Sequence, residues 1–193
     1  MKTRYLALSL LVSMTCGFSA SAPDAENTLK KSVGEVVGIA KDSKSPSALR
    51  ESLSPVLMKS ISFDTMTRRA IGPGWRQFTE SQQKEATRLF TTLIIRTYSS
   101  KFTPGELPEI SYKTAQCPAP GRVEIATTTL YKGSKYEVIY RLEDTSGWRI
   151  TDVVIEGASL VANYRTQFDA EFKEGGVDAV LNALKKSASQ STD

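Results

Sequence analysis

The spacing of hydrophobic residues changes twice along this chain of 193 residues. Apolar side chains recur at helical spacing up to about residue 101, alternate with other residues from Glu109 to Ile155, and return to helical spacing from about Leu160. Short turns at 132–134 and 144–147 separate the alternating segments, and such turns join antiparallel strands. The pattern predicts an α+β fold, with a curved antiparallel sheet of about four strands covered by helices and an N-terminal helical section.

The helical segments have recognisable ends. We expect helices at 26–41 and around 49–57, where Pro55 marks a kink or break, and a short helix at 65–71 with Asp64 as its cap.

The strongest helical pattern runs from about 80 to 101. Thr79, just before this segment, and Gln82, within its first turn, have the spacing of a capping box. This spacing predicts a helix start at Glu80. Gly175-Gly176 predicts an interruption of the last helical segment, which follows the sheet.

Residues 1–22 have the composition of a secretory signal peptide. Lys2 and Arg4 are followed by an apolar run, Leu6 to Val12, and then by small residues up to Ala22. The apolar run is too short for a membrane-spanning helix. We therefore expect export to the periplasm in soluble form, a single domain at 23–186 and a polar tail at 187–193.

Two other interpretations of the leader stay open. A lipoprotein site at Cys16 fits poorly, because Thr15 and Ser13 stand where a small and an aliphatic residue are needed. Uncleaved anchoring is an alternative, because Pro23 directly after Ala22 hinders cleavage there.

Composition excludes several kinds of reaction centre. The chain has no histidine, so it has no Ser-His-Asp triad, no Cys-His nucleophile and no HExxH zinc site. Without the leader the chain has Cys117 as its one cysteine, which we interpret as a bystander. It also keeps 23 basic and 21 acidic residues with no run of like charge, so nucleic-acid binding has little support. No catalytic residue, metal site or cofactor is predicted.

One acidic residue needs a separate interpretation. Asp152 shares a strand face with Trp148, Ile150 and Val154. A carboxylate on an apolar face can serve as a general base with a raised pKa, as in small sheet-and-helix enzymes that enolise carbonyl compounds. The other interpretation is a hydrogen-bonded structural acid near the strand end. The lack of a second catalytic partner favours the structural interpretation.

The last strand is also apolar on its other face, where Val153 and Ile155 lie. A strand that is apolar on both faces is usually buried on both. Ordinary core packing and a cavity for an apolar ligand both explain this pattern, and the sequence does not separate them.

Several segments in the same order resemble a known family. They are Phe63-Asp64, Arg69 to Gly72 and Trp75-Arg76 near the third helix, Tyr140 to Leu142 and Gly147 to Val153 in the sheet, and Glu156 to Leu160 and Asn163 to Phe168 after it. Together they resemble the MlaC-type (toluene-tolerance) periplasmic phospholipid carriers over about Phe63 to Leu184. The family's aromatic residue next to the tryptophan is replaced here by Gly74.

The resemblance implies an NTF2-like, MlaC-like fold and a carrier that is not an enzyme. Family members hold lipid acyl chains in an apolar cavity between sheet and helices. They carry lipid between an outer-membrane lipoprotein complex and an inner-membrane ABC transporter complex, which maintains outer-membrane lipid asymmetry. Two alternatives remain: a small NTF2-like enzyme with Asp152 as general base, and a periplasmic interaction protein with a filled core.

A set of residues, here called the predicted wall residues, follows from strand alternation and helix face if such a cavity exists. The set comprises Trp75, Phe90, Ile94, Ile125, Val138, Tyr140, Trp148, Val153, Ile155 and Tyr164. Within this set, Trp75 and Trp148 are expected as rim or wedge residues of the cavity, and a structural role is an equal alternative for either one. Asp152 and Arg165 match the family signature, and we expect a charge-assisted pair between them.

Overall fold

The computed structural model describes residues 21–190. The predicted signal peptide therefore lies outside the described residues except for Ser21 and Ala22, which begin the first helix. In the described part of the chain, no helix is long and apolar enough to cross a bilayer.

Residues 21–190 form five helices and a short 3₁₀ segment besides the sheet. Helices α1 (Ser21–Asp42), α2 (Pro46–Ser60), α3 (Phe63–Ile71) and α4 (Glu80–Ser99) precede it, with η1 (Gly72–Gln77) between the last two. Helix α5 (Leu160–Ser189) follows the sheet. The α+β order predicted from hydrophobic spacing is confirmed.

The sheet is antiparallel, open and six-stranded. Its strands are β1 (Glu109–Tyr112), β2 (Gln116–Ala119), β3 (Arg122–Tyr131), β4 (Ser134–Asp144), β5 (Trp148–Ile155) and β6 (Ala158–Ser159). The order is β1-β3-β4-β5-β6, and β2 pairs with the other end of β3 on the same edge as β1. The four expected strands correspond to β1, β3, β4 and β5. Strand β2 lies where a loop was expected, because Pro118 and Pro120 gave no strand signal at this sheet edge.

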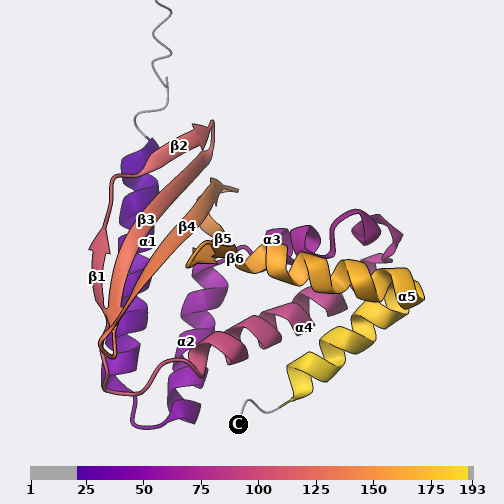
Figure 1. Cartoon of the computed structure of the whole chain (residues 1–193), viewed down its shortest axis with the longest axis horizontal. Coiled ribbons are helices and arrows are strands. Elements are labelled where there is room, and N and C mark those ends of the chain that lie inside the picture. The colour runs from indigo at the N-terminus through magenta and orange to yellow at the C-terminus, as the bar shows by residue number, and fades with distance from the viewer. Residues whose placement is uncertain (1–20, 191–193) are drawn as a thin grey trace, which may run out of the picture.

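The two faces of the sheet differ in chemistry. Register places Ile125 opposite Tyr140, and Tyr140 opposite Val153, so these residues share one face. Helix α1 covers this face with Ala25 and Leu29, which are buried against it, and Figure 1 shows α1 lying along the sheet. We call it the α1 face. The opposite, polar face carries charged pairs between strands.

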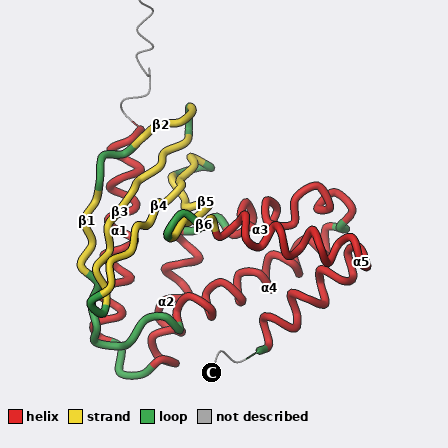
Figure 2. The backbone as a smooth tube through the Cα atoms, viewed as in Figure 1, coloured by secondary structure: helices red, strands yellow, loops and turns green. Residues whose placement is uncertain are grey.

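The other helices form a second core beside the sheet. Buried side chains of α3, α4 and α5, among them Met66, Phe90 and Leu184, pack together, and Figure 2 shows this helical layer next to the strands. A smaller cluster of Ala40, Leu49 and Leu53 joins α1 to α2. The helices are therefore held by cores of their own as well as by the sheet.

The capping box and the glycine interruption are confirmed, whereas α1, α2 and α3 begin earlier than expected. Thr79 and Gln82 form the capping box reciprocally, and Gly175 and Gly176 have non-helical backbone angles within α5. Asp64 does not cap α3, which begins at Phe63, two residues before the expected start, with Ser62 at the N-cap position.

Helix α2 runs through Pro55 without ending. Pro55 is exposed, so water can bind the backbone carbonyl that loses its partner there.

Two glycines allow α5 to approach η1 closely. A Cβ atom on Gly74 would lie 2.8 Å from the Phe172 ring, and one on Gly72 would lie 2.0 Å from the guanidinium carbon of Arg165. Gly72 also has φ of +70°, which side chains disfavour. The Phe172 ring thus occupies the space above Gly74, the position at which the resembled family has an aromatic residue.

We predict that Gly74→Ala lowers the free energy of unfolding by about 1–3 kcal/mol, because the added methyl group overpacks the contact with Phe172. Gly34→Ala is the matched control, since Gly34 is exposed in α1 with open space around it. It should raise stability by about 0.5–1 kcal/mol. Urea unfolding measures both values, and an unchanged midpoint for Gly74→Ala would contradict the packing described.

Candidate functional site

The predicted wall residues of the sheet all lie on the α1 face. Val138 pairs with Ile155, Tyr140 pairs with Ile125 and Val153, and Trp148 pairs with Asp144 at the other end of β4. Four of the six, Ile125, Tyr140, Trp148 and Val153, belong to the cluster that packs beneath α1.

The predicted wall residues of the helices lie in the second core. Phe90 and Tyr164 meet edge to face with ring centroids 5.1 Å apart, and Ile94 is buried in the same cluster. Trp75 stacks on Phe78 at 5.6 Å at the far side of this core. The structure therefore divides the predicted set between two apolar clusters and does not gather it around one point.

Burial separates the predicted wall residues further. Phe90 and Ile125 have no exposed surface, and Ile94 and Val138 are also buried. The others are half-buried: Trp75, Tyr140, Trp148, Val153, Ile155 and Tyr164. A ligand can touch the half-buried group directly, whereas contact with the buried group requires the packed side chains to part.

Ile61 joins the two clusters and was not singled out from the sequence. It follows α2, forms a parallel bridge with Ile150, and packs against both cores. The Ser62 N–H also donates to the Ile150 carbonyl at 2.8 Å. The sequence gives little indication of this role of Ile61, because an isolated isoleucine between two helices is not part of a periodic pattern.

Tyr98 is a second residue outside the predicted wall residues, because the sequence showed it only as part of the apolar stripe of a helix. It lies near the end of α4, and its pKa is raised by burial first, and then by the nearby Tyr164 and Asp152. It is therefore close to both the helical core and β5.

Two cavities open elsewhere on the molecule. One, of about 620 Å³, lies between α1 and α2 next to Glu35, Ile39 and Val56. The other, of about 440 Å³, lies between the start of α3 and the β4–β5 turn, next to Phe63 and Arg149. Neither is lined by a predicted wall residue.

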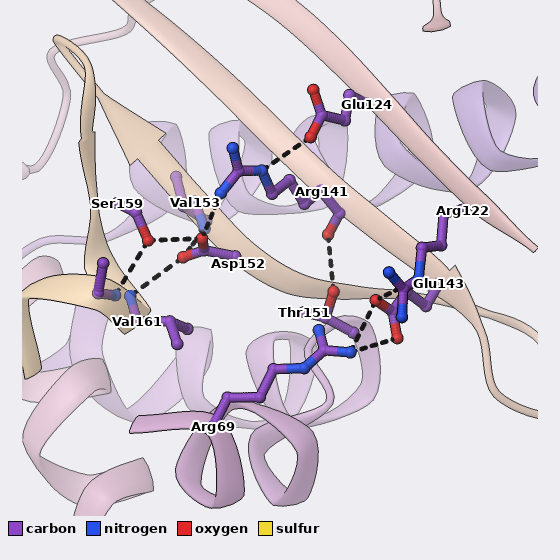
Figure 3. Close-up of polar contacts among 11 residues, drawn as sticks. Arg69, Arg122, Glu124, Arg141, Glu143, Thr151, Asp152, Val153, Ser159 and Val161 are labelled. Carbon is purple, nitrogen blue, oxygen red and sulfur yellow. Dashed lines mark hydrogen bonds and ion pairs between the residues drawn. The ribbon is translucent and has the colours of Figure 1, made fainter. Parts of the chain in front are cut away.

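Asp152 is a structural acid. Its Oδ1 accepts hydrogen bonds from the backbone N–H groups of Val153 (2.9 Å) and Val161 (3.1 Å). Its Oδ2 accepts from the Arg141 guanidinium (3.0 Å) and the Ser159 hydroxyl (2.7 Å). Figure 3 shows the carboxylate held between the sheet and the start of α5. Both oxygens are occupied by protein donors, so neither presents a free lone pair to a substrate.

The expected pair between Asp152 and Arg165 is wrong. Arg165 instead binds Asp169 one turn along α5, with Nε 3.0 Å from each carboxylate oxygen, and also donates to the Arg69 carbonyl. Asp152 takes Arg141 as its partner because the two lie opposite each other on neighbouring strands. A register shift between Arg141 and Leu142 puts Asp152 on the polar face, whereas Trp148 and Ile150 lie on the α1 face, so the expectation that these three residues share a strand face is wrong. The register of the sheet was needed to make this assignment.

A second ion pair ties α3 to the sheet. Arg69 Nη2 lies 2.8 Å from both carboxylate oxygens of Glu143, and Arg122 approaches the same carboxylate at 3.3 Å (Figure 3). The polar face of the sheet thus positions helices. Among residues 21–190, no group of three His, Cys, Asp or Glu side chains could hold a metal ion.

Tyr140 lies on the α1 face in an enclosed setting. Burial raises the pKa of its phenol to about 12, with a smaller effect of Tyr112 beside it. Burial also raises the pKa of Tyr112, and the Lys30 ammonium lies 5.4 Å from the centre of that ring. Both phenols on this face therefore stay neutral at a higher pH than a free tyrosine.

An open curved sheet with one apolar face against a helix, and with a polar face that positions further helices, defines a class of small α+β domains. Within that class, the family model described as MlaC protein matches residues 30–186. The chain belongs to the MlaC family, as the sequence motifs predicted.

A solved structure that this chain resembles is that of a phospholipid-binding protein from Ralstonia solanacearum in complex with a phospholipid. The TM-score is 0.79 at 26% sequence identity, with 86% of this chain and 98% of that chain covered. No curated protein matches this chain.

We predict that Asp152→Ala lowers the free energy of unfolding by about 2–3 kcal/mol, because Arg141 and the first turn of α5 lose a charged acceptor. Glu124→Ala removes the other acid that binds Arg141, at 2.8 Å, and this pair is more exposed. This control should cost about 1 kcal/mol or less. Chemical denaturation of both variants checks the difference, and equal losses would contradict the role assigned to Asp152.

The raised pKa of Tyr140 predicts a loss of stability at high pH. The fold favours the neutral phenol, so this contribution is fully present below pH 10, the ordinary tyrosine value, and is lost as pH rises towards 12. Absorbance titration should show a tyrosine that ionises near pH 12 and disappears in Tyr140→Phe. A titration with every tyrosine near 10 would count against the enclosed setting.

Proposed function

We propose that this protein is a periplasmic phospholipid carrier that holds acyl chains between the α1 face and the helical core. The observation that carries the proposal is the pair of apolar clusters, on sheet and helices, which meet at Ile61 beside β5 and include the half-buried Tyr140, Val153 and Tyr164. Family membership and the phospholipid complex of the Ralstonia protein support the same function.

The transfer of a phospholipid from a bilayer into water has a large free-energy cost, which a carrier can reduce. Two acyl chains of about fifteen methylenes each, at ~0.8 kcal/mol per buried CH₂, represent roughly 24 kcal/mol of transfer free energy. A lipid therefore escapes a bilayer into water very slowly. An apolar interior offered by the protein removes most of this cost, since the chains exchange one apolar environment for another.

In this proposal the two cores part to admit the chains. The polar contacts of Asp152 and Glu143 lie on the opposite face of the sheet, so they hold the layers together while the apolar side separates. Phe90 and Ile125, which are sealed in the closed fold, become wall residues when a lipid enters. The headgroup stays in solvent.

The partners follow from the same energetics. Burial that makes loading favourable also makes release slow, so unloading requires a membrane-bound partner that opens the protein or offers apolar surface. We infer transfer between an outer-membrane lipoprotein complex and an inner-membrane ABC transporter complex, which serves outer-membrane lipid asymmetry. The leader at residues 1–22 supports delivery to the periplasm.

The enzyme alternative has no observation in its favour. Its general base would be Asp152, and four protein donors occupy that carboxylate. Binding and transport without chemical conversion is therefore the proposed activity.

Organic extraction of the purified protein, prepared without detergent, tests the proposal. We expect mass spectrometry to find co-purified phospholipid in an amount comparable to that of the protein. Lipid-free protein that also takes up no phospholipid from vesicles would contradict the carrier function.

The wall assignment is tested by a pair of matched variants. Val153→Trp places a large ring on the half-buried α1 face and should lower bound phospholipid severalfold while leaving the fold intact. Ile139→Trp makes the same change on β4, at a half-buried position of the opposite face, and should leave lipid content unchanged. Circular dichroism verifies folding, and full lipid loading of Val153→Trp would show that the chains bind elsewhere.

A further inference from the structure

Exposed apolar side chains gather at one end of the sheet. In the part of the chain that the structure describes, four large hydrophobic side chains are exposed: Met58 (57%), Leu107 (43%), Leu130 (42%) and Tyr136 (38%). Leu130 and Tyr136 flank the β3–β4 turn, and Leu107 lies in the loop before β1. Met58 is separate from them, in α2 beside Arg149 of β5.

The loop before β1 is attached to the β3–β4 turn. The Thr103 N–H donates to the Tyr131 hydroxyl at 2.8 Å, and Lys132 Nζ donates to the Thr103 hydroxyl at 2.6 Å. Lys132 also pairs with Glu106 at 3.3 Å. Leu107 therefore belongs to the same surface as the turn. We call residues 130–136 together with Leu107 the hairpin end.

The hairpin end carries an exposed apolar side chain on each of its faces. Leu130 pairs with Lys135, and Thr129 pairs with Tyr136, so Leu130 and Tyr136 point to opposite sides of the ribbon that β3 and β4 form, which β1 borders as far as Leu130. Side chains 132–136 are exposed, whereas β3 is buried at alternate positions from Val123 to Thr127. The ribbon therefore leaves the core at this end.

Charge is ordered along the ribbon. The six residues 131–136 contain Lys132 and Lys135 and no acidic residue. The Lys135 side chain is 67% exposed. The nearest acids lie behind the turn: Glu109 opposite Leu130, Glu137 with a carboxylate oxygen 3.6 Å from Lys135 Nζ, and Glu106 bound to Lys132. The outermost charge is positive, which complements the phosphates of phospholipid headgroups.

We propose that the hairpin end docks on the surface of a phospholipid bilayer. Leucine inserts at the boundary of the acyl chains, tyrosine rings favour the headgroup region, and lysines extend towards phosphates. The proposal rests on the proposed function in one respect. Tyr136, Val138 and Tyr140 alternate along β4 on the α1 face, so an apolar track runs from the docked end to the candidate lipid site.

Vesicle flotation tests the docking. The processed protein, recovered from the periplasm of an expression host, is mixed with phosphatidylcholine vesicles or with equal parts phosphatidylcholine and phosphatidylglycerol. Wild type should float with both, and at least threefold more with the anionic vesicles. The double variant Leu130→Asn/Tyr136→Ser should lose at least fivefold of the bound fraction on both. The double variant Lys132→Gln/Lys135→Gln should float with phosphatidylcholine vesicles like wild type and should lose only the additional binding to vesicles that contain phosphatidylglycerol.

Met58→Asn is the matched control, because it removes the most exposed hydrophobic side chain outside the hairpin end. It should float like wild type. Wild type that floats with neither vesicle would overturn the proposal. Equal flotation of wild type and Leu130→Asn/Tyr136→Ser, or an equal loss in Met58→Asn, would also overturn it.

Lipid extraction separates this proposal from the carrier function. Leu130→Asn/Tyr136→Ser should retain wild-type phospholipid content, because neither side chain lies in a buried cluster. Flotation without any bound phospholipid would leave the docking in place and contradict the carrier function. Bound phospholipid without flotation would support the carrier function and contradict the docking.

Discussion

The Asp152 carboxylate is the contact on which the arrangement of the two layers depends. It is buried, and it binds Arg141 of β4, the Ser159 hydroxyl and the first turn of α5 at Val161. A buried carboxylate without these donors would carry a large desolvation cost. The strand β5 therefore fixes where α5 begins, and α5 in turn carries Phe168 into the helical core.

The other joints between sheet and helices are close to the same strand. Ile61 bridges to Ile150, and Arg69 binds Glu143 on the neighbouring strand. Hydrogen bonds and ion pairs depend on direction, so these joints fix the position of the helices against β4 and β5. The contact between apolar clusters is not directional, and apolar side chains pack equally well against each other or against other apolar groups. In the proposed carrier function, this difference allows the domain to accept acyl chains without a permanent cavity.

Local patterns predicted many of the elements correctly. The capping box at Thr79 and the break at Gly175 are confirmed, because their causes lie within a few residues of chain. Predictions that needed a distant partner were less successful. Asp64 has the composition of a cap and yet lies inside α3, whose start is set by the bridge at Ile61. The strand β2 exists because β3 offers it an edge.

The sequence by itself determined the α+β class, the order of helices and strands, and the family. Each of these depends on alternation or spacing along the chain. Only the tertiary structure decided that Asp152 pairs with Arg141 and not with Arg165, and that the predicted wall residues divide between two cores. The physical reason is that such contacts join residues far apart in the chain, and their geometry is set by strand register and helix packing.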